Sequence, residues 1–135
     1  MSFEPQLEDS EIFEWYDGLV LGLARFGGLE ALVCLLAFDP DARRRLYLFL
    51  VISSEMAEHL RTLFRERGPQ AFTAQVISNA LGQSGVCYLT EFEPKMGEVV
   101  KLRPLDEKRR EMLRSLSFPL IEQATRKSEF WDWFT

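Results

Sequence analysis

The chain has 135 residues, 47% of them apolar and 27% charged, so it is long enough to bury one core without a disulfide or a metal and predicts a single domain over residues 1–135. Its formal charge of −5 disfavours nucleic acid and anionic lipid as partners, because the summed field repels polyanions. The sequence shows no signal-peptide pattern and no apolar run near the ~20 residues of a membrane-spanning helix, which predicts a cytoplasmic protein without membrane attachment.

The N-terminal region is acidic and then becomes aromatic. Residues 1–11 predict a loosely structured segment. Ile12, Phe13, Trp15 and Tyr16 follow as a cluster that we expect to pack on the core.

An antiparallel three-stranded meander is predicted next. In residues 19–26 large leucines alternate with smaller residues, which is typical of a strand, and Gly27-Gly28 suits the type I′ turn of a hairpin. The runs 29–38 and 45–52 are apolar on both faces of the strands that they predict. Since antiparallel sheets usually keep one face in water, we expect both faces to be covered, by helices or by a second subunit.

Two amphipathic helices follow the meander. Ser53 or Ser54 is suited to cap the first helix, whose apolar residues recur at helical spacing and which ends at Gly68. The second helix is predicted from about Pro69 to Leu81, and Gly82 is expected just beyond its end.

Residues 85–103 predict a second hairpin with more polar faces. In this hairpin we expect three side chains of the first strand to lie opposite a valine of the second strand. The three are Val86, Tyr88 and Phe92, and the valine is Val99 or Val100.

The predicted fold class is therefore α+β. An antiparallel sheet of about five strands, made of the meander and the C-terminal hairpin, packs with two central helices and one or two C-terminal helices. Asp106 is expected to cap the first C-terminal helix, and Pro119 either kinks this helix or begins a second one. The sequence leaves open whether the two hairpins share one sheet.

Few groups in the sequence are suited to chemistry. His59 is the only histidine, and Glu55 one turn before it could share a metal, but two ligands make no complete site. Cys34 and Cys87 lie in apolar runs, which indicates buried, reduced thiols, although Cys87 could pair with His59 in a cleft. Phosphate-binding loops, zinc spacings and serine nucleophile motifs are absent. We therefore predict no catalytic, cofactor-binding or metal-binding residues and no enzyme activity.

Two features of the sequence suit a protein interface. A basic run between two apolar strands forms either a solvated loop or a contact for an acidic surface. The aromatic C-terminus either packs on the protein itself, where it covers the free face of the sheet or pairs with Trp15 and Tyr16, or belongs to a dimer or partner interface. The predicted interface residues are Trp15, Tyr16, Arg43, Arg44, Phe130, Trp131, Trp133 and Phe134.

The order of the predicted elements, with the small size and the acidity, resembles that of the dimeric chaperones that hold secreted effectors in type III secretion systems. The resemblance covers residues 12–127 and implies a homodimer. Our leading hypothesis is instead a small acidic protein-binding module, of the inhibitor or immunity type, that acts on a basic protein partner by surface complementarity. The chaperone is the first alternative. The second is a small-molecule binder or enzyme that uses a cleft with Cys87 and His59.

Overall fold

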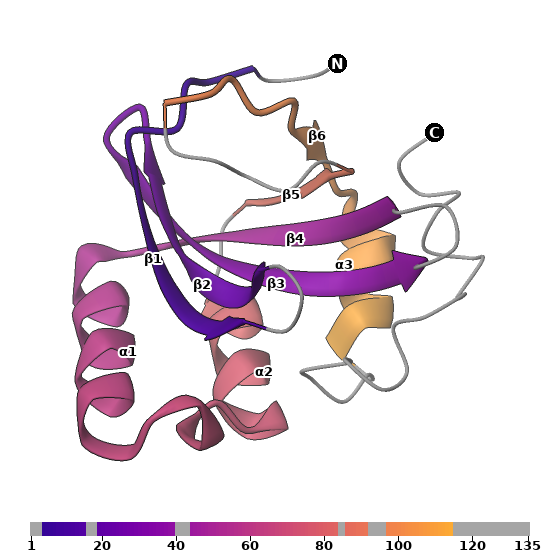
Figure 1. The fold of residues 1–135 in the computed structure, drawn as a ribbon. Coiled ribbons are helices and arrows are strands. Elements are labelled where there is room, and N and C mark those ends of the chain that lie inside the picture. Colours follow the sequence, from indigo (N-terminus) through magenta and orange to yellow (C-terminus); the bar gives the residue numbers. More distant parts are fainter. Residues whose placement is uncertain (1–3, 16–18, 40–43, 84–85, 92–96, 115–135) are drawn as a thin grey trace.

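The computed structural model describes residues 4–15, 19–39, 44–83, 86–91 and 97–114. Within these ranges the strands, the α-helices and one short 3-10 helix (η1) follow one another as shown in Figure 1: β1 (Asp9–Trp15), β2 (Leu19–Phe26), β3 (Leu29–Asp39), β4 (Arg44–Ile52), α1 (Ser54–Arg67), η1 (Pro69–Ala71), α2 (Ala74–Gln83), β5 (Cys87–Thr90), β6 (Arg103–Pro104) and α3 (Glu107–Arg114). The six strands form one antiparallel sheet in sequence order. The predicted α+β class is confirmed, and both hairpins belong to the same sheet.

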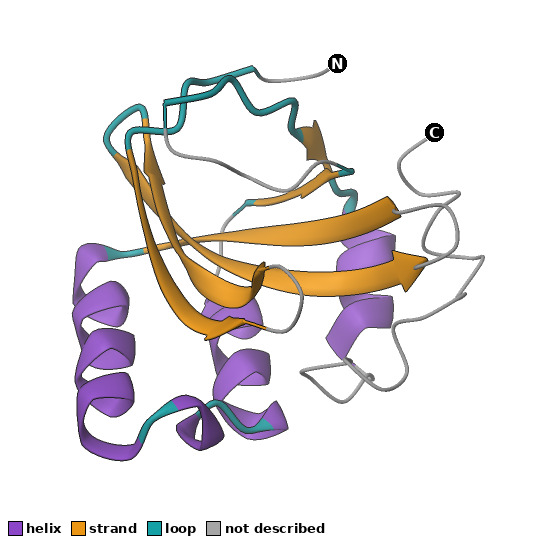
Figure 2. Cartoon of the chain, in the orientation of Figure 1, coloured by secondary structure: helices purple, strands orange, loops and turns teal. Residues whose placement is uncertain are grey.

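One face of the sheet packs on the helices, which Figure 2 shows below the strands. Leu21, Leu23, Leu48 and Leu50 are among the strand residues on this face, and all are buried. The helices contribute buried side chains to the same cluster: Ala57 and Leu60 from α1, Ile77, Ala80 and Leu81 from α2, and Leu113 from α3. Leu21 and Leu23 of β2 therefore mark the face that meets the helices, as period-two spacing requires, whereas Leu19 belongs to the cluster on the opposite face.

The opposite face of the sheet has its own buried cluster, which includes Phe26, Val33 and Phe49. In the described part of the chain no helix residue belongs to this cluster. Leu7 and Leu102 also belong to this cluster, and they lie in the extended segments that precede the two edge strands, β1 and β6. The expectation that both faces are buried is confirmed. Within the described residues the expectation of helices is wrong for this face, because the protein's own extended segments, at Leu7, Val100 and Leu102, contribute its cover.

A set of backbone hydrogen bonds joins the N-terminal segment to the segment before β6. The Leu7 amide donates to Glu98 O at 2.9 Å, the Gly97 amide donates to Leu7 O at 2.8 Å, and the Val100 amide donates to Pro5 O at 2.9 Å. An isolated bridge pairs Gln6 with Val99 in the same place. This clasp, residues 5–7 against 97–100, connects the two edges of the sheet.

Short-range signals predict the turns and caps correctly. Gly27 and Gly28 both have positive φ, 55° and 77°, as a type I′ turn requires. The Ser53 hydroxyl accepts from the Met56 amide at 3.1 Å and begins α1, and Gly68 at φ 74° ends it. Asp106 caps α3 by accepting from the Arg109 amide at 2.8 Å.

The prediction for the N-terminus is wrong from residue 9 onward. Residues 9–15 form the strand β1. Of the three described residues of the predicted aromatic cluster, Phe13 is buried, whereas Ile12 and Trp15 are more than half exposed. Tyr16 lies outside the described residues.

Two further element boundaries differ from the prediction. The stretch from Pro69 is a 3-10 turn followed by α2, and Gly82 lies inside the last turn of α2 instead of beyond it. In the second hairpin Tyr88 pairs with Pro104, while Val99 bridges to Gln6 in the clasp, so the expected register is wrong. Phe92 and Pro119 lie outside the described residues. None of the described helices is long and apolar enough to cross a membrane.

Candidate functional site

β1 is held against α1 and η1 by one ion pair and one aromatic cluster. Arg61 Nε of α1 donates to Glu11 Oε1 of β1 at 2.7 Å. The Phe13 ring lies with its centroid 4.8 Å from the ring centroids of both Phe64 and Phe72. These contacts fix the backbone of β1 on the side that faces the helices.

Arg61 is the centre of a charged network. Besides Glu11, its guanidinium donates to Glu30 Oε1 of β3 at 3.0 Å and to Glu58 Oε1 of its own helix at 2.5 Å. Burial lowers the pKa of Arg61, but the hydrogen bonds to the three carboxylates outweigh burial and raise it. For Glu30 the effects have the opposite signs. Burial raises the pKa of this carboxyl, but the hydrogen bonds from Arg61 and Arg25 outweigh the effect of burial and hold the pKa below its ordinary value of 4.5. Glu30 and Arg61 are therefore both charged at neutral pH.

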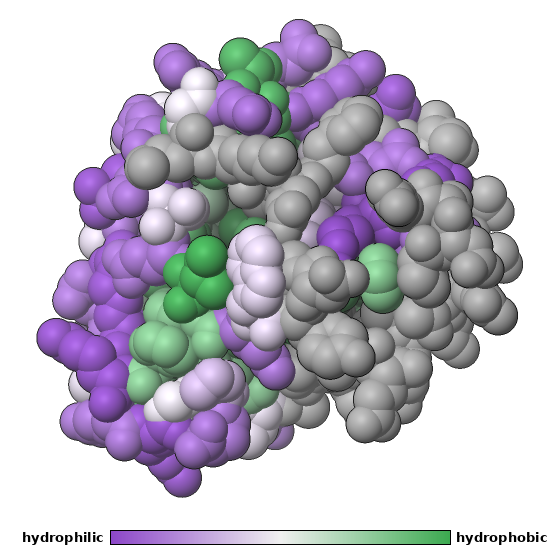
Figure 3. Space-filling model, viewed as in Figure 1, coloured by the Kyte–Doolittle hydropathy of each residue, from purple (hydrophilic) through white to green (hydrophobic). Residues whose placement is uncertain are grey.

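The other side of β1 carries exposed apolar side chains. Ile12 is 52% exposed and Trp15 is 58% exposed. Shifts in the register with β2 occur between Ile12 and Glu14 and again between Glu14 and Trp15. Bulges of this kind re-aim side chains at the edge of a sheet. In Figure 3 a small hydrophobic area lies over the position that β1 takes in Figure 1, with hydrophilic surface beside it.

Two of the predicted interface residues lie in the described part of the chain, at the same end of the sheet. β1 ends at Trp15, and β4, which runs parallel to β2, begins there at Arg44, with β2 and β3 between them. Arg44 forms an ion pair with Glu91 at the end of β5. The remaining predicted interface residues lie outside the described ranges: Tyr16, Arg43, Phe130, Trp131, Trp133 and Phe134.

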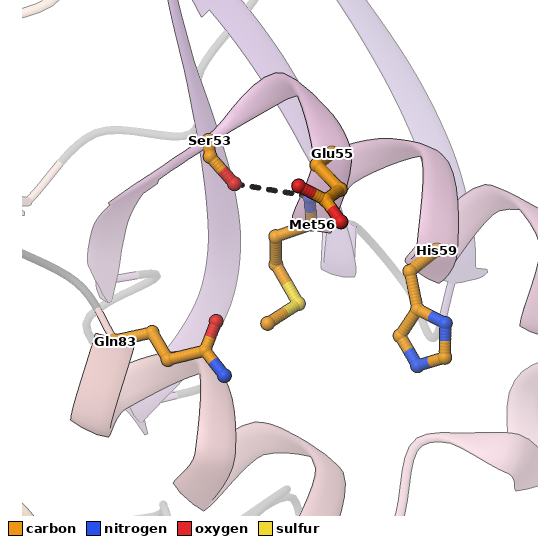
Figure 4. A pocket seen from close by; sticks show the side chains of 5 residues that line it. All are labelled: Ser53, Glu55, Met56, His59 and Gln83. Carbon is orange, nitrogen blue, oxygen red and sulfur yellow. Dashed lines mark hydrogen bonds between the residues drawn. The ribbon is translucent and has the colours of Figure 1, made fainter.

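His59 lies at a shallow hollow between α1 and the end of α2. The hollow has a volume of about 340 Å³ and is lined by Ser53, Glu55, Met56, His59 and Gln83. Figure 4 shows the Met56 and Gln83 side chains approaching each other, with His59 one turn further along α1. His59 is exposed, and its neighbours are polar or flexible side chains, so the hollow is an open surface feature.

Both cysteines lie in the core, away from this hollow. Cys34 and Cys87 are each 1% exposed and belong to the cluster beneath the helices. Burial, together with the nearby Cys87 thiol, raises the pKa of Cys34 to about 12. The structure therefore separates Cys87 from His59: one is enclosed by leucines, and the other faces solvent.

A metal centre is not evident where the structure can be described. Across residues 4–15, 19–39, 44–83, 86–91 and 97–114, no three side chains of His, Cys, Asp or Glu gather closely enough to hold a metal ion. Among the described residues, Glu55 and His59 have no third side chain of these types close enough to hold a metal ion with them.

Comparison with protein-family models, with curated proteins and with solved structures finds no significant match to this chain.

Sequence reasoning misses the network around Arg61. The spacing of Glu58 and Arg61 on one helix is visible in the sequence, because residues three apart are neighbours on a helix. Glu11 and Glu30 lie 50 and 31 residues away from Arg61, and nothing local marks them as its partners.

Proposed function

We propose that the protein is a small acidic protein-binding module, of the inhibitor or immunity type, which recognises a basic protein partner by surface complementarity and performs no chemistry of its own. The observation that carries this proposal is the exposed Trp15 on a strand whose backbone is fixed by the contacts of Glu11 and Phe13. Tryptophan is enriched among the residues that dominate binding energy, and a rigid strand loses little entropy when it binds.

The charge of the chain supports a basic partner. The net charge of −5 would steer a positively charged protein toward it and raise the association rate. The free, buried thiols of Cys34 and Cys87 suit a reducing compartment, which supports a cytoplasmic location.

The proposal is tested with the full chain as bait in a pull-down from its native host, washed at low and at high salt. We expect one stoichiometric basic protein that is lost at high salt, because electrostatic attraction between exposed charges is screened. A folded bait that captures no stoichiometric protein contradicts the proposal. Turnover of generic esterase, phosphatase or nuclease substrates that is lost in His59→Ala contradicts it as well, and favours the alternative of an enzyme.

The type III chaperone alternative has its own test. It requires a homodimer, so light scattering that finds a strict monomer at tens of micromolar would exclude it.

A further inference from the structure

The hollow at the start of α1 brings together side chains that carry metal-binding atoms. It has a volume of about 340 Å³, and Glu55, Met56 and His59 of α1 line it together with Gln83 of α2. The three α1 residues offer a carboxylate, a thioether sulfur and an imidazole. Figure 4 shows the Met56 and His59 side chains extending from α1 to the same side. The hollow therefore contains both hard and soft donor atoms.

The spacing of these residues along α1 puts them on one face of the helix. Met56 and His59 are three residues apart, and Glu55 and His59 are four apart, so each pair consists of neighbours on the helix surface. The helix is fixed at this end, because the Ser53 hydroxyl accepts from the Met56 amide at 3.1 Å. The backbone that carries the donor atoms therefore needs no rearrangement to present them.

The polar donor atoms of the hollow have no other role in the described structure. Among the residues that the structure describes, no hydrogen bond or ion pair engages the side chains of Glu55, His59 and Gln83. Glu58, on the same helix, is by contrast paired with Arg61. The carboxylate of Glu55 and the imidazole of His59 are both exposed, so they are accessible to an ion from solvent.

The types of the donor atoms select the metal. Zn²⁺ in proteins takes roughly three or four ligands from Cys, His and carboxylate side chains, and the described residues around Glu55 and His59 supply no third ligand of these types. The thioether of Met56 is a soft ligand that favours Cu(I), and imidazole also suits copper. Cu(I) is stable at low coordination number, so a thioether and an imidazole are sufficient for it. The carboxylate of Glu55 balances the single positive charge of the ion.

We propose that Met56 and His59 bind a soft monovalent metal ion, Cu(I), in this hollow, with Glu55 as the counter-charge. Because the hollow is open to solvent, the site takes up and releases the ion without opening of the fold. Binding involves no oxidation or reduction. The inference goes beyond the proposed protein-binding function and does not depend on it.

The chain contains other soft ligands, and their positions distinguish them from Met56. Cys34 and Cys87 are each 1% exposed within the core, so an ion reaches them only when the fold opens. Met112 is 47% exposed on α3, but it has no histidine on its own helix, since His59 is the only histidine of the chain. Of the described methionines, Met56 is therefore the one with an imidazole one helical turn away.

The test uses the full chain with ¹³C-labelled methionine methyl groups and ¹⁵N-labelled histidine, followed by NMR. Ag(I) is the probe, because it has the ligand preferences of Cu(I) and keeps its oxidation state in aerated, chloride-free buffer. We expect stoichiometric Ag(I) to shift the Met56 methyl and His59 ring signals together, and Zn²⁺ at the same concentration to leave the Met56 methyl signal unchanged. A shift of His59 without Met56, or Ag(I) bound at the cysteines alone, overturns the inference.

Matched variants separate this pair of ligands from the rest of the chain. Met56→Leu keeps the volume of the side chain and His59→Gln keeps a polar one, and each should weaken Ag(I) binding at least about tenfold. Met112→Leu should leave the affinity unchanged. Glu55→Gln should weaken binding about threefold, and Glu66→Gln, which removes the same charge from an exposed position further along α1, should change it less. If Met112→Leu weakens binding as much as Met56→Leu does, or if His59→Gln binds as tightly as the unmodified chain, the proposed site is wrong.

Discussion

Arg61 donates to carboxylates from three different elements: Glu11 of β1, Glu30 of β3 and Glu58 of α1. Glu30 is the most buried of the three, and it also accepts from Arg25. A buried carboxylate with these partners stabilises the fold only while it is ionised.

The network predicts a specific loss of stability in acid. The pKa of Glu30 lies below its ordinary 4.5, because the hydrogen bonds from Arg61 and Arg25 outweigh the effect of burial. The stabilisation is therefore complete above about pH 4.5, the value expected in the unfolded chain, and is lost as pH falls through the lower folded value. Glu30→Gln cannot titrate, so its stability should fall less steeply between pH 5 and pH 3 than that of the unmodified chain.

Urea unfolding at a series of pH values measures this difference. Glu4→Gln is the matched control, because Glu4 is an exposed carboxylate outside the helices and strands, and its curve should follow that of the unmodified chain. Parallel curves for all three proteins would show that the charge of Glu30 makes no net contribution.

The raised pKa of Cys34 predicts that this thiol is inert in the folded protein. Burial and the neighbouring Cys87 raise its pKa to about 12, so little thiolate exists near pH 8, and the surrounding leucines exclude reagents. Alkylation followed by mass spectrometry should label Cys34 only in denaturant, while an introduced thiol at the exposed Ser10, in Ser10→Cys, should react without it. Labelling of Cys34 at the rate of the Ser10→Cys thiol would contradict the buried position.

At the scale of elements, β1 lies close against β2 at Gly22. A Cβ on Gly22 would lie 2.3 Å from Glu11 O, which is well inside van der Waals contact with a backbone atom. Glycine is therefore required at position 22, where bulged β1 lies against β2. The reason is the lack of space for a Cβ and not a positive φ.

Two glycine-to-alanine changes should have opposite effects. Gly22→Ala forces β1 away from β2 and should lower the free energy of unfolding by about 2 kcal/mol, as overpacking does. Gly82→Ala places its Cβ in open space within α2 and should be neutral or raise stability by up to about 1 kcal/mol, because alanine favours helix. Thermal unfolding of both variants and of the unmodified chain measures the two changes in stability. A neutral Gly22→Ala would mean that β1 is not held at this crossing.

Sequence patterns predict some of these elements well and others poorly, for physical reasons. Caps and tight turns depend on two to four neighbouring residues, so Ser53, Asp106 and the Gly27-Gly28 turn are predicted correctly. β1 is missed because bulges break its period of two: only Phe13 is buried in a strand of charged and exposed residues. The expectation that Ile12 and Trp15 pack on the core is wrong for the same reason, and both side chains are exposed.

At the scale of the whole molecule, the acidic N-terminal segment has two roles that the sequence does not separate. Its carboxylates lie outside, and Leu7 lies inside, where it completes the cluster on the face of the sheet without helices. The apolar runs of β3 and β4 predict that this face is buried. They cannot predict what buries it, because the clasp joins residues more than 90 positions apart.

Leu7 should therefore matter far more than its acidic surroundings suggest. It is 1% exposed, and its backbone makes two of the hydrogen bonds of the clasp. Leu7→Ala leaves these bonds possible but removes buried side-chain volume, so the free energy of unfolding should fall by about 3 kcal/mol. Leu29→Ala, a chemically identical change at a half-exposed position, should cost less than about 1 kcal/mol. Urea unfolding gives both values, and hydrogen exchange at the Leu7 and Val100 amides should accelerate in Leu7→Ala, because the clasp opens more often. If the two variants unfold alike and the Val100 amide stays protected, the second cluster holds together without Leu7, and β1 would then be held by its pairing with β2 and by the contacts of Glu11 with Arg61 and of Phe13.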